Sequence, residues 1–134
     1  MSARSKARKR ALDVLFASEM RNRSTAEALE DQAEAGLVND YTVTLVQGVT
    51  EHRTHLDEVI STYAQGWTLN RMPAVDRNVL RMATFEVLYV DDVPNAVAVS
   101  EALNLVRDLS TDESPAFVNG VLGNIVRDRD LLTR

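Results

Sequence analysis

The first ten residues hold a cluster of cations that could bind the phosphates of a nucleic acid. Five of the fifteen basic residues lie here with no acid, so the rest of the chain keeps ten basic residues against all twenty acidic ones. A local charge of +5 beside a body of −10 predicts two partners of opposite charge. A solvated chain terminus is the alternative. The cluster comprises Arg4, Lys6, Arg8, Lys9 and Arg10.

A second candidate for chemistry is the pair His52 and His55, whose spacing can place two imidazoles on one face of a helix to bind a metal. Glu51 and Asp57 are near in sequence, but no third ligand stands at a fixed spacing and no general base is evident. We therefore assign His52 to the boundary of the core and His55 to the surface. We expect no metal and no other cofactor.

Helices must position these residues, because no stretch shows sustained alternation of apolar and polar side chains. Apolar residues at helical spacing predict a helix over residues 4–20, with the basic cluster in its first two turns. Ser24 and Glu27 form a capping box that begins a second helix, and Gly36 is suited to end it. An unbroken four-three spacing predicts one long helix over residues 40–65.

The stretch from residue 67 to 90 is apolar on nearly every side after Pro73, which is typical of a buried helix. Further helices are expected over residues 96–109 and after residue 113, with Ser114 as N-cap and Pro115 in the first helical position. We therefore predict an all-α fold of six to seven helices, forming a single domain over the whole chain.

Charges within the buried helix need partners. We assign Arg77, Arg81 and Glu86 to an internal salt-bridge network rather than to a ligand. No apolar run in the chain exceeds four residues, so we expect neither a signal peptide nor a membrane span, and a cytoplasmic location.

Several stretches, in order along the chain, together resemble the NusB family of transcription antitermination proteins over nearly the whole length. The resemblance implies two small three-helix bundles around the buried central helix, and no catalysis. It implies an adaptor that binds boxA, a single-stranded element of ribosomal RNA leaders, together with the small-subunit ribosomal protein NusE, in a complex with RNA polymerase. The matching stretches are residues 10–16, 45–49, 75–81 running into Phe85 and Glu86, 97–102 and 117–122.

The resemblance also implies functional positions. The RNA-contacting positions of the family fall on the basic cluster of residues 4–10 and on Phe117, before which this chain has Ala116 where the family often has a basic residue. The positions that face NusE fall on Phe16, Asp76 and Glu113. Two structural alternatives stay open: a core position for Phe117, and an internal ion pair for Asp76.

Two other functions are weighed against the adaptor. A NusB-like domain also heads some ribosomal RNA cytosine methyltransferases, but this chain has no cysteine nucleophile and no G-x-G-x-x-G among its five glycines. It could then serve only as a stand-alone accessory module of an RNA-modifying enzyme. A purely protein-binding helical module would use the acidic surface alone, and RNA binding by residues 1–10 separates it from the adaptor. The sequence leaves a homodimer open.

Overall fold

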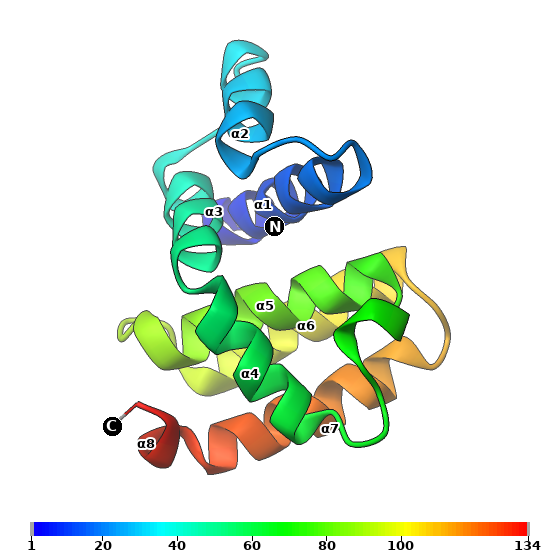
Figure 1. Ribbon diagram of the computed structural model, residues 1–134. Coiled ribbons are helices and arrows are strands. Elements are labelled where there is room, and N and C mark those ends of the chain that lie inside the picture. Colours follow the sequence, from blue (N-terminus) through cyan, green and yellow to red (C-terminus); the bar gives the residue numbers. More distant parts are fainter. Residues whose placement is uncertain (1, 134) are drawn as a thin grey trace. The chain divides into compact units, whose positions relative to one another are not determined.

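The computed structural model describes residues 2–133, and within them it contains eight α-helices, one short 3₁₀ helix and no strand (Figure 1). The all-α prediction is confirmed, and the helices exceed the predicted six to seven. Contacts divide the chain into two units, Met1–Glu51 and His52–Arg134, which are described separately; the single domain stays a prediction. The helices are α1 (Ala3–Met20), α2 (Thr25–Glu34), α3 (Asp40–Glu51), α4 (Arg53–Tyr63), the 3₁₀ helix η1 (Leu69–Arg71), α5 (Ala74–Tyr89), α6 (Asn95–Leu109), α7 (Ser114–Arg127) and α8 (Arg129–Leu132).

In the first unit, α1, α2 and α3 pack against one another. Helix α1 begins where the Ser2 hydroxyl accepts a hydrogen bond from the backbone N–H of Ser5 at 3.0 Å. The small residues Ala7 and Ala11 are fully buried on its inner face. The Thr42 hydroxyl of α3 donates to the carbonyl oxygen of Ala7 at 3.1 Å, which ties α3 to the basic end of α1.

The predicted N-cap of α2 at Ser24 and its C-terminal Gly36 are confirmed. The Ser24 hydroxyl accepts a hydrogen bond from the backbone N–H of Glu27 at 3.1 Å, and it donates to the Glu27 carboxylate at 3.1 Å. Two residues after the helix, Gly36 has φ of +72°, a left-handed conformation that glycine adopts without a steric penalty.

The prediction of one long helix over residues 40–65 is wrong. The helix is interrupted at His52, whose φ of −101° and ψ of 13° leave the helical range. Only His52 leaves the helical conformation, and no residue is inserted between α3 and α4. The apolar residues therefore keep their helical spacing across the break. The His52 ring stacks on Tyr89, with ring centroids 4.1 Å apart. His55, expected on the surface, is half-buried edge-on against Tyr89. Among residues 2–133 no cluster of three side chains could hold a metal.

In the second unit, α4, α6, α7 and α8 all contact α5, whose predicted burial is confirmed. Arg81 is assigned correctly to an internal pair: its Nε lies 2.7 Å from Oδ1 of Asp57, and its Nη2 lies 3.1 Å from Oδ2. The Arg77 guanidinium donates to the backbone carbonyls of Leu69 and Met72. Helix α5 therefore carries its arginines within the fold.

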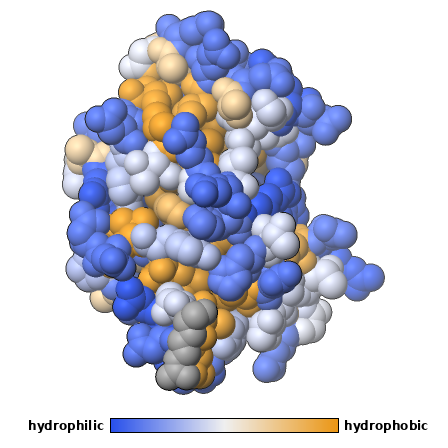
Figure 2. Space-filling model, turned by 60° about the vertical axis from the view of Figure 1, so that its left-hand side comes forward, coloured by the Kyte–Doolittle hydropathy of each residue, from blue (hydrophilic) through white to orange (hydrophobic). Residues whose placement is uncertain are grey.

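The surface carries several large apolar side chains on both units. Figure 2 shows a mostly hydrophilic face with apolar areas between the polar residues. None of the helices in the described part of the chain has the length and apolarity needed to cross a membrane. The exposed large apolar residues include Phe16, Met20, Leu37, Trp67, Tyr89, Val97, Leu109 and Leu131.

An acid-sensitive contact joins α4 to the end of α7. The Tyr63 hydroxyl donates to Asp128 at 2.7 Å, and hydrogen bonds from Arg127 and Tyr63 lower the pKa of Asp128 from 3.8 to about 2. A carboxyl whose pKa is lower in the folded state stabilises the fold above pH 3.8 and loses this contribution as the pH falls toward 2.

We expect Tyr63→Phe to raise the pKa of Asp128 and to move acid unfolding to a higher pH, because one hydrogen-bond donor to the carboxylate is removed. Carboxyl NMR titration and circular dichroism between pH 5 and pH 1.5 measure the two effects. The control Tyr89→Phe removes a hydroxyl elsewhere in the unit and should leave Asp128 unchanged. Equal titration of Asp128 in Tyr63→Phe and wild type would contradict the assignment.

Candidate nucleic-acid and partner interface

Burial separates Arg8 from the other cations predicted to bind RNA. Arg8 is only 3% exposed, and its guanidinium carbon lies 5.6 Å from the centre of the Tyr41 ring. Arg4 lies closer to the same ring, at 4.2 Å. Both distances suit cation–π contacts, which hold the first turns of α1 against α3.

The remaining predicted cations face a groove. Lys6, Lys9 and Arg10 line it on α1, and residues 36–39 of the loop before α3 line the other side, around a volume of about 560 Å³. Asp13 pairs with Lys9 at 2.8 Å and with Arg10 at 3.9 Å. Pairs as exposed as these contribute little stability, so the cations can exchange Asp13 for a phosphate at low cost.

Phe16 also lies on α1, one and a half turns after Arg10, and is 38% exposed. Its neighbours Leu12 and Leu15 are buried. Met20, one turn further along the same helix, is exposed as well. The predicted partner position is thus an aromatic ring on an accessible apolar strip of α1.

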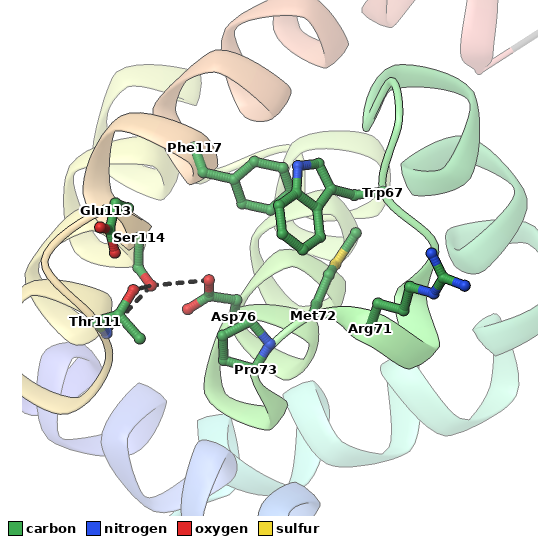
Figure 3. Close-up of a pocket in the computed structure, with 9 residues that line it drawn as sticks. All are labelled: Trp67, Arg71, Met72, Pro73, Asp76, Thr111, Glu113, Ser114 and Phe117. Carbon is green, nitrogen blue, oxygen red and sulfur yellow. Dashed lines mark hydrogen bonds between the residues drawn. The ribbon is translucent and has the colours of Figure 1, made fainter.

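In the second unit, an aromatic pocket brings together three of the predicted positions (Figure 3). Its volume is about 450 Å³, and its wall includes Asp76, Glu113 and Phe117. The half-buried Phe117 ring lies 6.0 Å from the ring of Trp67, at an interplanar angle of 60°. The sequence reasoning missed Trp67. A signal was present, because Trp67 lies outside every periodic apolar face, in the segment before Pro73.

Asp76 lies at the inner side of this pocket and is 2% exposed. Its carboxylate accepts hydrogen bonds from Ser110 at 2.6 Å and from Ser114 at 2.8 Å. The prediction of Ser114 as N-cap of α7 is therefore wrong. Glu113 takes that position, and the Ser114 hydroxyl accepts from the N–H of Thr111. The Ser114 side chain is directed toward Asp76 of α5 and not toward the N–H groups in the first turn of α7.

Two surfaces of different chemistry result, one on each unit. The groove on α1 presents cations suited to phosphates. The pocket presents two aromatic rings for stacking, with the exposed Glu113 as an acceptor and Arg71 at its edge. Phe117, Asp76 and Glu113 share the pocket, whereas the basic cluster and Phe16 lie in the other unit.

These features define an all-helical protein with a basic groove and an aromatic pocket, and comparison with known proteins identifies its family. Residues 5–127 match the NusB family, to which the chain belongs. It is 65% identical over 135 residues to the transcription antitermination protein NusB of a Nocardioides species, covering 98% of this chain and 99% of the relative. A NusB from an Arthrobacter species is 56% identical, with 93% of both chains covered.

Solved structures agree with this assignment. NusB of T. maritima superposes with a TM-score of 0.87 at 32% identity, covering 95% of this chain and 92% of the other. A chain from a structure of the antitermination factors NusB and NusE in complex with double-stranded RNA gives a TM-score of 0.83 at 25% identity, covering 92% and 96%.

Proposed function

We propose that this chain is an RNA-binding transcription antitermination adaptor, without catalytic activity, that binds boxA RNA together with NusE. The observation that carries the proposal is the groove lined by Lys6, Lys9 and Arg10. The names of the relatives and the complex of NusB, NusE and RNA support it. Assembly with RNA polymerase, a cytoplasmic location and the arrangement in two three-helix bundles belong to the same proposal.

The charge distribution supports two separate partners. The chain outside residues 1–10 carries −10, which repels RNA and attracts a basic ribosomal protein. Phe16, Asp76 and Glu113 are the proposed contacts to that protein. Asp76 is buried beneath its serine partners, so the exposed Glu113 is the acid that a cation of the partner would meet first.

A comparison of two RNAs tests the RNA-binding function. The pure protein is titrated with a fluorescent boxA-type RNA and with an RNA of the same bases in shuffled order, at several salt concentrations. We expect tighter binding of the boxA-type RNA, and weaker binding of both as salt rises. Absence of binding at low salt, with or without NusE, would overturn the proposal.

Reversing the charge of Glu113 tests the partner surface. We expect Glu113→Lys to weaken NusE binding about tenfold, because a like charge then faces a basic partner. RNA binding by the isolated protein should persist or tighten slightly. Isothermal titration calorimetry measures both affinities. Glu58→Lys makes the same charge change on the exposed side of α4 and serves as the matched control. Equal NusE affinities of the two variants would exclude Glu113 from the interface.

A further inference from the structure

We propose that Trp67 and Arg71 form a nucleotide subsite, in which one base of single-stranded RNA stacks on the indole ring and the adjoining phosphate pairs with the guanidinium. The inference rests on the proposed RNA-binding function and assigns part of it to the aromatic pocket. Neither residue belongs to the positions that the family resemblance implies.

Trp67 is held in place although it is exposed. The residue is 51% exposed, but its backbone N–H donates to the carbonyl oxygen of Ala64 at 2.9 Å. The Phe117 ring lies against the indole, and the buried Met72 lies beside it in the pocket (Figure 3). An exposed ring supported in this way can stack on a base at a small cost in side-chain entropy.

The charges around the pocket determine which part of a nucleotide can enter. Asp76 and Glu113 both lie in its wall, so a phosphate is repelled from the interior. A neutral base is not repelled. Arg71 is exposed, and its side chain extends outward from the edge of the pocket in Figure 3, where it can meet a phosphate while the base lies inside.

The polar side of the pocket suits the edge of a base. The exposed carboxylate of Glu113 lies in the pocket wall and can accept hydrogen bonds. Amino groups of adenine, cytosine or guanine can donate to it. Aromatic stacking, a cation at the edge and an acceptor in the wall together match the way proteins bind single-stranded nucleic acid.

The fluorescence of Trp67 tests the subsite directly, because it is the only tryptophan in the chain. The full-length protein is titrated with a boxA-type RNA, and RNA anisotropy is recorded in parallel. We expect the indole emission to be quenched over the same RNA concentrations at which the anisotropy rises. Replacing bases one at a time by an abasic residue should identify one position at which quenching is lost while binding remains.

Variants separate stacking from charge. Trp67→Leu should weaken RNA binding about tenfold without changing the log–log salt slope. Arg71→Gln should make that slope flatter by about 0.7, the value for one phosphate contact with a single strand. Leu109→Ala removes an exposed apolar side chain of α6 in the same unit and should change neither quantity. If Trp67→Leu does not fold, the quenching of the wild-type protein still decides the question.

Three results would overturn the subsite, and each leaves a different conclusion. If anisotropy shows RNA binding while the emission of Trp67 stays constant, the subsite is wrong and the adaptor function stands. If NusE quenches Trp67 and RNA does not, the pocket takes a protein side chain instead. A complete absence of RNA binding would remove the proposed function and the subsite together.

Discussion

Replacing Lys6, Lys9 and Arg10 together by alanine is expected to weaken RNA binding about 50-fold at 0.15 M salt. Each phosphate contact with a single strand contributes roughly 0.7 to the log–log salt slope, so the slope should become flatter by about 2. The three side chains line the groove on α1, whereas Arg8 is buried against Tyr41 and is left unchanged to preserve the fold. Fluorescence anisotropy at four or more salt concentrations measures both quantities.

A control variant distinguishes the groove from the overall charge. Arg21, Arg53 and Arg107 are exposed at other places on the surface, and their replacement by alanine makes the same change in net charge. We expect this variant to lose only a few-fold in affinity through the weaker long-range field. Equal losses in the two variants, or a salt slope that the groove substitutions leave unchanged, would show that the phosphates bind elsewhere.

Arg81→Met is expected to lower the free energy of unfolding by about 3 kcal/mol, because it removes the buried arginine of the pair and leaves Asp57 with only its longer contact to the exposed Arg53. The Arg81 side chain is 5% exposed, and it binds Asp57 through two hydrogen bonds. Urea unfolding followed by circular dichroism measures the change. A folded Arg81→Met protein should still bind RNA, since the arginine contributes to the structure rather than to a ligand.

The same carboxylate supplies a matched control. Arg53 also pairs with Asp57, but at 3.7 Å and with a side chain that is 54% exposed. Replacement of Arg53 by methionine should lower the free energy of unfolding by less than about 0.5 kcal/mol, as is usual for an exposed ion pair. Equal destabilisation by Arg53→Met and Arg81→Met would mean that burial does not set the strength of these pairs.

Local signals predicted most of the helices. The cap of α2 at Ser24, the left-handed Gly36 and the buried α5 are all determined by residues close in sequence. Ser114 shows where local reasoning fails: its hydroxyl binds Asp76, which lies 38 residues earlier in the chain. The break at His52 is similar. Its aromatic partner Tyr89 belongs to a different helix, so the spacing of apolar residues around His52 does not indicate the contact.

The candidate sites divide in the same way. Charge clustering located the basic end of α1, but it could not show that Tyr41 covers Arg8 while three neighbours face a groove. Residue types alone also gave no reason to link Trp67 with Phe117, which are adjacent only in the folded unit. The sequence therefore predicts which side chains could bind a ligand. Whether each of them is buried or exposed depends on how the other helices pack against it.

The affinity of the protein for boxA RNA, measured with and without saturating NusE, tests the adaptor most directly. The account predicts binding at least about tenfold tighter in the presence of NusE, and an equal gain in NusE affinity when the RNA is present, because coupling between two bound partners is reciprocal. It also predicts that NusE raises the affinity for the shuffled RNA less than the affinity for boxA RNA. An RNA affinity that is the same with and without NusE, and the same for both RNAs, would contradict it.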